Sequence, residues 1–173
     1  MAVYHAFHYG KMNQSFKLEN ESNLSLYEAN LIKFKLLTAS DYEFVNRVTS
    51  TTTLRKVGKT KSVEQGTMGV NMTTASYFKL DGKNCFDILA EKGYSITILK
   101  KLDLLHPEFA LVDQSGSQIA VYKMNVVGEK EEGVAAIGNK QSNTLITTES
   151  DDLDSVFLGA FILGNVEFSL YLL

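Results

Sequence analysis

Cysteine and proline each occur only once in this chain, and histidine only three times. The single cysteine, Cys85, excludes an internal disulfide and fits a reducing compartment, although a secreted, cysteine-poor bacterial protein would have the same composition. His5 and His8 lie three positions apart, which on a strand directs them to opposite faces and prevents them from binding one metal ion together. The sequence therefore predicts neither a disulfide framework nor a metal centre.

No secretory leader is expected either. The first ten residues contain no lysine or arginine and no long apolar run, so nothing indicates a signal peptide. The chain has 173 residues, enough for one domain with a sizeable core, and its 45% apolar and 21% charged residues are ordinary for a globular protein. We therefore expect one domain, residues 1–173, resident in the cytoplasm.

Common catalytic and nucleotide-binding motifs are also missing. Gly58-Lys59-Thr60 looks like the end of a phosphate-binding loop, but Thr53 stands where that motif requires its first glycine. Cys85 lies in an apolar segment without a nearby histidine, which is typical of a small buried side chain and not of a nucleophile. No order of serine, histidine and aspartate supports a catalytic triad. We expect no enzyme activity, no cofactor, no metal and no nucleic-acid partner.

Opposite charges gather in the two parts of the chain. Residues 1–100 carry 13 of the 17 basic and 9 of the 20 acidic residues, whereas residues 101–173 carry 4 basic and 11 acidic ones. We interpret the densest basic stretch as an exposed loop. Such a loop is either a contact for a polyanion or a mobile segment that its charges keep solvated. Its basic residues are Arg55, Lys56, Lys59 and Lys61.

Short apolar and β-branched runs separated by turn formers fill most of the chain and predict a mainly β fold. Asp81-Gly82, Lys92-Gly93 and Ser115-Gly116 supply turns of the kind that hairpins require. Pro107 cannot donate to a ladder and is expected at a strand edge or corner, and residues 126–132 read as an exposed loop. The predicted strands are 4–9, 15–19, 24–34, 42–48, 67–80, 85–90, 94–100, 109–113, 119–124, 134–137 and 144–148.

Residues 153–173 are apolar on every side at helical spacing and follow acidic residues suited to a helix start. A helix of this kind must be enclosed, and a closed barrel, a bilayer or a partner protein could each enclose it. Asn165, Glu167 and Ser169 inside the stretch, without flanking lysine or arginine, argue against the bilayer. The many strands favour a barrel with 153–173 as its axial helix.

Three consecutive segments, 93–101, 102–113 and 116–123, carry a further pattern. A strand ends in Lys100-Lys101, a short link leads to Pro107 and another strand, and an Asp-x-x-Gly turn is followed by Ile-Ala-x-x-Lys. Together with the apolar C-terminal helix, this pattern resembles the tubby-like superfamily, most closely its LURP-one-related and bacterial tubby-C-terminal-like branches. The match covers residues 93–124 and, in character, the terminal helix.

The resemblance implies a closed antiparallel β-barrel of about a dozen strands around a central apolar C-terminal helix. The superfamily includes tubby proteins, which bind phosphoinositides at membranes, and phospholipid scramblases. This chain lacks the cysteine-rich palmitoylation segment and the calcium-site features of a scramblase. No phosphoinositide-binding residue of tubby can be assigned to a position here.

Two functions follow from the sequence. The first is a non-enzymatic binding module that contacts anionic lipid headgroups or another polyanion through the basic loop, in the cytoplasm or peripherally at a membrane. The alternative is a scaffold or protein-interaction barrel without lipid affinity, in which the basic loop only keeps the protein solvated.

Overall fold

The computed structural model describes residues 1–9, 15–33, 40–62, 72–99, 107–126, 143–165 and 168–170. Within these residues the chain forms twelve strands and two helices. The helices are α1 (Cys85–Glu91) and α2 (Leu153–Asn165). The strands are β1 (Ala2–Tyr9), β2 (Ser15–Asn20), β3 (Ser25–Lys33), β4 (Ser40–Asn46), β5 (Thr51–Ser62), β6 (Met72–Leu80), β7 (Lys83–Asn84), β8 (Ser95–Ile98), β9 (Glu108–Val112), β10 (Gln118–Val126), β11 (Asn143–Thr148) and β12 (Phe168–Leu170).

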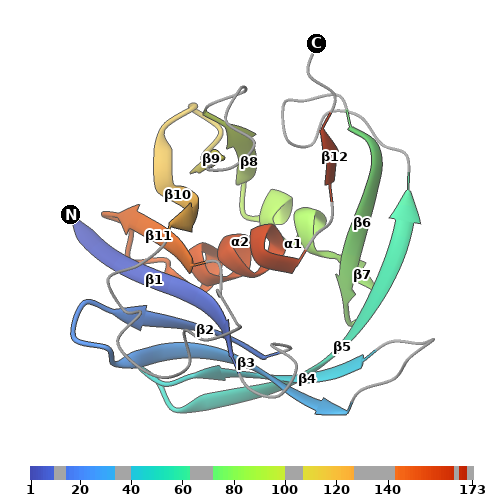
Figure 1. Cartoon of the computed structure of the whole chain (residues 1–173), viewed down its shortest axis with the longest axis horizontal. Helices are drawn as coiled ribbons and strands as arrows, with labels where there is room; N and C mark the ends of the chain where they lie inside the picture. Colours follow the sequence, from blue (N-terminus) through green and yellow to red (C-terminus); the bar gives the residue numbers. More distant parts are fainter. Residues whose placement is uncertain are drawn as a thin grey trace.

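All twelve strands belong to one curved sheet, which wraps around α2 (Figure 1). The strand order is β12-β6-β5-β4-β3-β2-β1-β11-β10-β9-β8, with β7 paired to β6. Every pairing is antiparallel. β1 joins two meanders, because it pairs with β2 on one side and with β11 on the other. The mainly β prediction is therefore confirmed.

The core lies between α2 and the concave face of the sheet. Phe157 stacks on Tyr27 of β3 with ring centroids 5.3 Å apart, and Phe161 meets Phe44 of β4 edge to face, also at 5.3 Å. On the opposite side, the Tyr122 hydroxyl of β10 donates a hydrogen bond of 2.9 Å to the carbonyl oxygen of Val156. The helix is thus enclosed by protein, as its apolar pattern requires.

Within the described residues the sheet is not closed into a barrel. β8 and β12 are the two ends of the strand order, and no pairing joins them within the described residues. α1 contacts β8 at one end of the sheet and β6 and β7 towards the other, and it also packs on α2 (Figure 1). α1 therefore covers the core at the gap between the two ends of the sheet. In a closed barrel, paired strands would have to fill this gap.

The predicted strand 85–90 is wrong, because this segment is α1. Its buried residues are Cys85, Phe86 and Leu89, a helical spacing, whereas Asp87 is exposed. The helix ends where Gly93, at φ 81°, lets its own N–H donate to Ala90 and that of Tyr94 to Leu89. Lys92-Gly93 is thus a helix terminus and not a hairpin turn.

The predicted axial helix 153–173 is also too long. α2 has 13 residues and ends at Asn165, and β12 then pairs with β6. The helix terminus is fixed by a distant residue, since His8 Nε2 on β1 donates to the carbonyl oxygen of Gly164 at 2.8 Å. A Cβ at Gly164 would lie 3.0 Å from the ring of Phe16, so α2 also approaches the sheet closely there.

Two of the predicted turns are confirmed. Asp81 and Gly82 both have positive φ, 54° and 81°, and join β6 to β7. The Asp113 carboxylate accepts hydrogen bonds from the backbone of Ser115 and Ser117 in the turn between β9 and β10, where Gly116 has φ 82°. The predicted strand 134–137, most of the loop 126–132, Lys100-Lys101 and part of the predicted strand 67–80 lie outside the described residues.

Candidate functional site

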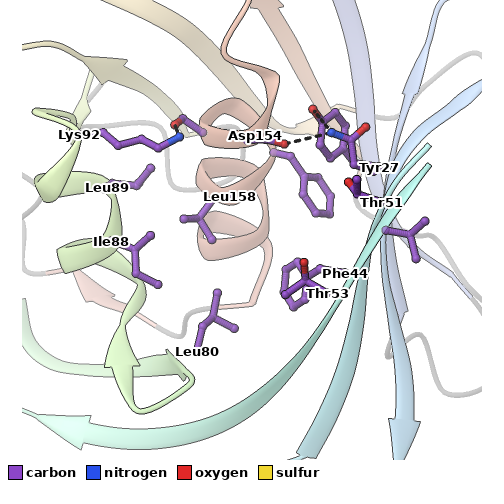
Figure 2. A pocket seen from close by; sticks show the side chains of 14 residues that line it. Tyr27, Phe44, Thr51, Thr53, Leu80, Ile88, Leu89, Lys92, Asp154 and Leu158 are labelled. Atoms are coloured by element: carbon purple, nitrogen blue, oxygen red, sulfur yellow. Dashed lines mark hydrogen bonds between the residues drawn. The ribbon is translucent and has the colours of Figure 1, made fainter. Parts of the chain in front are cut away.

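A pocket of about 300 Å³ lies between α1, the first turns of α2 and the concave face of β3, β4 and β5 (Figure 2). Its volume is at the lower end of the range for small-molecule sites. One wall is aromatic, with Tyr27, Phe44 and Phe157. The facing wall is aliphatic. Its residues are Leu80, Ile88, Leu89 and Leu158.

One polar group of the pocket joins the sheet to the start of α2. The side-chain amide of Asn46 donates to the Tyr27 hydroxyl at 3.1 Å and to Asp154 Oδ1 at 3.4 Å. Asn46 Oδ1 accepts from the backbone of Val48 and Thr49, which fixes the orientation of the amide. Burial, and then the hydrogen bond to Asp154, raise the pKa of Tyr27 far above its ordinary value. The tyrosine therefore remains a neutral hydroxyl beside a carboxylate.

A second polar group lies on the other side of the helix start. Lys92 Nζ donates to Ser155 Oγ at 3.1 Å and to Asp152 Oδ1 at 3.4 Å. Asp152 is the N-cap of α2, because Ser155 N donates to its Oδ1 at 3.2 Å. Figure 2 shows Lys92 and Asp154 on opposite sides of α2. The pocket thus carries one ammonium group and one carboxylate, held apart by the helix.

Asp152 gives stability that depends on pH. Burial raises its pKa, but the hydrogen bonds from Ser155 and the charge of Lys92 outweigh burial, so the net pKa is lowered. A lowered carboxyl pKa stabilises the fold above the pKa of the unfolded chain, and this contribution is lost as pH falls through the folded pKa. Asp152→Asn keeps the cap and removes the charge. We expect it to lower the free energy of unfolding by about 0.3–1 kcal/mol at pH 7, a difference that shrinks below about pH 4.

Thermal melts of the unchanged protein and of Asp152→Asn between pH 3 and pH 7 measure how their stability difference depends on pH. Asp151→Asn is the matched control, because Asp151 is exposed and its carboxylate does not cap the helix. A constant difference between Asp152→Asn and the unchanged protein down to pH 3 would contradict the assignment.

The basic residues predicted to occupy a loop lie instead on a regular strand. Arg55, Lys56, Lys59 and Lys61 all belong to β5, which pairs with β4 through positions 51–57 and with β6 through positions 57–62. Lys56, Gly58 and Lys59 hid this strand, because lysine and glycine are poor strand formers. These four residues therefore occupy positions on both faces of β5.

The register assigns these faces. Tyr42 on β4 packs its ring edge to face against Phe161 of α2, so position 42 faces the helix. Directly opposite residues of adjacent strands share a face, and Arg55 is opposite Tyr42. Because strand positions alternate, Lys59 and Lys61 occupy positions on this concave face too. Lys56, opposite Asp41, is on the convex face.

The remaining residues singled out in the sequence have structural places. His5 and His8 are on opposite faces of β1, because positions of odd and even number alternate there. Cys85 is buried, with 1% of its surface exposed. Gly58-Lys59-Thr60 lies within β5 and not in a loop before a helix, the arrangement that a phosphate-binding loop requires. His106 lies outside the described residues.

Sequence reasoning missed the pocket. Asp152 and Asp154 were recognised as acids at a helix start, but nothing in the sequence connects them with Asn46 or Lys92. Asn46 is 108 positions from Asp154, and Lys92 is 63 from Ser155. Lys92-Gly93 is the one available signal. Because glycine often ends a helix, this pair would place a lysine at the end of α1, provided that the segment before it is taken as a helix.

Searches among known proteins give no relative for this chain: no family model, no curated protein and no solved structure matches it. The resemblance to the tubby-like superfamily therefore stays a prediction. In the part of the chain that the structure describes, neither helix has the length and apolar character needed to cross a bilayer.

Proposed function

We propose that this protein is a non-enzymatic binding module for a polyanion, an acidic lipid headgroup or another multiply charged anion, which it contacts along β5. The observation that carries the proposal is the common face of positions 55, 59 and 61, the face towards α2. Positions 55 and 61 are roughly 20 Å apart along the strand. A row of three cations on one face favours a ligand with several negative groups.

The cross-strand neighbours support the same ligand. The residues opposite Arg55, Lys59 and Lys61 are Tyr42, Phe78 and Ser76, none of which is charged. Lys56, in contrast, is opposite Asp41. Opposite charges directly across a ladder reduce each other's field, and none of the three concave positions has a carboxylate directly opposite it on β4 or β6.

The concave position also favours one bound anion over attraction to a flat surface. A membrane plane would meet the convex face of the sheet, where only Lys56 of the four residues has its position. A headgroup or a free polyanion is small enough to reach the concave face. Both sources present the same chemistry, clustered phosphate-like charge, and a competition experiment distinguishes them.

The test is sedimentation with vesicles that contain a phosphoinositide, compared with vesicles of neutral lipid. We expect the triple variant Arg55→Gln, Lys59→Gln and Lys61→Gln to lose more than a hundredfold in affinity, since each hydrogen bond to a charged group contributes about 1.5 kcal/mol or more. Lys56→Gln, the matched control on the other face, should bind almost normally. Salt should weaken binding by screening, and tripolyphosphate should compete if the site takes free polyanions.

Three results would overturn this proposal. Equal losses for Lys56→Gln and the triple variant would indicate contact through the convex face. Full binding by a folded triple variant, with an unchanged melting temperature, would place the contact away from β5. If the unchanged protein binds neither the vesicles nor tripolyphosphate at low salt, the scaffold function remains.

We also propose membership of the tubby-like superfamily. The support is the curved antiparallel sheet around an apolar helix near the C-terminus, together with the Asp113-x-x-Gly116 turn that connects the matching strands. A fully closed barrel is the remaining feature that this proposal implies. The edges β8 and β12 are the strands that closure would have to join.

A further inference from the structure

We propose that the pocket between α1, α2 and the β3–β5 face binds a small cationic amphiphile, an alkylammonium or arylalkylammonium ion, with its apolar body inside the pocket and its ammonium group at Asp154. This site adjoins the polyanion contact, because Thr51 and Thr53 of its lining precede Arg55 on the concave face of β5, but the inference does not rest on that function. It is argued from the lining, the charges and the shape of the pocket.

The apolar body is specified by the two walls. Leu80 and Leu89 are 2% and 1% exposed, and Ile88 and Leu158 are partly buried beside them. These side chains face the aromatic wall across about 300 Å³ (Figure 2). A chain or ring of modest size that enters this space leaves water and gains free energy in proportion to its buried apolar area.

The sign of the polar end follows from the charges. Asp152, the N-cap beside the pocket, and Asp154 in its lining are both carboxylates, whereas Lys92 is the one basic side chain among the lining residues that the structure describes. Lys92 is already held by Ser155 and Asp152, on the far side of the helix start from Asp154. An anion would have to enter beside two carboxylates. A cation gains their attraction instead.

The partners of Asp154 leave it able to accept a further donor. Asn46 donates to its Oδ1 at 3.4 Å and Tyr27 is a second hydrogen-bond partner, but a carboxylate has about four acceptor sites and this side chain is exposed to solvent. The aromatic wall lies beside it, with Tyr27 stacked on Phe157 at 5.3 Å between centroids. A carboxylate next to aromatic rings is the combination that recognises ammonium groups, because ring faces carry partial negative charge.

The experiment compares three probes of nearly equal size: hexylammonium, 1-hexanol and hexanoate, titrated into the full chain at pH 7 and followed by the amide resonances of α2 and β4. We expect hexylammonium to bind most tightly and hexanoate least. Asp154→Asn keeps the acceptor for Asn46 and removes the charge, and should weaken hexylammonium about tenfold while leaving hexanol unchanged. Asp151→Asn, an exposed acid outside the lining, should change neither.

A second variant keeps the test independent of charge. Ile88→Phe reduces the pocket volume from the α1 side and should weaken hexylammonium and hexanol together, provided that its melting temperature shows a folded protein. The proposal is overturned if the unchanged protein binds none of the probes, or if hexanoate binds as tightly as hexylammonium, which would assign the polar contact to Lys92. It is equally overturned if Asp154→Asn and Asp151→Asn have the same effect.

Discussion

A chain that ends after Asp152 should show no cooperative unfolding transition, because it lacks α2. Five large side chains of this helix, Val156, Phe157, Phe161, Ile162 and Leu163, are each at most 4% exposed. Burying side chains of this size stabilises a fold by about 1.5–3 kcal/mol each. Their sum is comparable with the entire net stability of an ordinary domain, about 5–15 kcal/mol. Without the helix, the concave face of the sheet would be exposed to water.

The matched control is a chain that ends after Asn165. It keeps α2 complete and removes β12, a strand of three residues whose ladder with β6 pairs Phe168 with Ala75 and Leu170 with Met72. We expect this chain to melt cooperatively at a somewhat reduced temperature. Circular dichroism and calorimetry of the two truncated chains give the answer. A sharp melt of the shorter chain would show that α2 is an appendage and that the sheet has a core of its own.

The strands that could be predicted from the sequence are those whose pattern is local. β1, β2, β3 and β9 to β11 are short segments rich in apolar and β-branched residues between turn formers, and the structure confirms them within a few residues. β5 was missed because its lysines lie on both faces of the strand, which removes the alternation. α1 was predicted as a strand because its seven residues, Cys85–Glu91, are too few to distinguish helical from strand spacing of apolar residues. Gly93, which ends the helix, is needed to decide between them.

Features that depend on distant residues could not be predicted. The end of α2 is fixed by His8, 156 positions earlier in the chain, whose ring donates to the Gly164 carbonyl. The pocket has the same origin, since Asn46, Lys92 and Asp154 come together only when β4, α1 and α2 pack. The sequence shows the basic residues of β5 as one dense group. Their division between the two faces required the register with Tyr42 and Asp41.

The close approach of α2 to β10 makes Gly159 the most sensitive single position that we can identify. A Cβ at Gly159 would lie 3.0 Å from Cζ of Tyr122 and closer still to its hydroxyl. Tyr122 is fully buried and its hydroxyl donates to Val156 O at 2.9 Å, so the ring has no free space into which to move. Forcing an extra methyl group into such a site destabilises a protein by about 1–3 kcal/mol, occasionally more.

We therefore expect Gly159→Ala to lower the free energy of unfolding by about 3 kcal/mol, which corresponds to a melting temperature about 10 °C lower for a chain of this length. This loss arises although alanine has the higher helix propensity. Tyr122→Phe alone loses one buried hydrogen bond, about 1 kcal/mol. In the double variant the hydroxyl that clashes is gone. The loss of unfolding free energy in the double variant should therefore be smaller than the sum of the two single losses. Additive losses, or a Gly159→Ala protein that melts like the unchanged one, would mean that Tyr122 does not pack against α2 at this position.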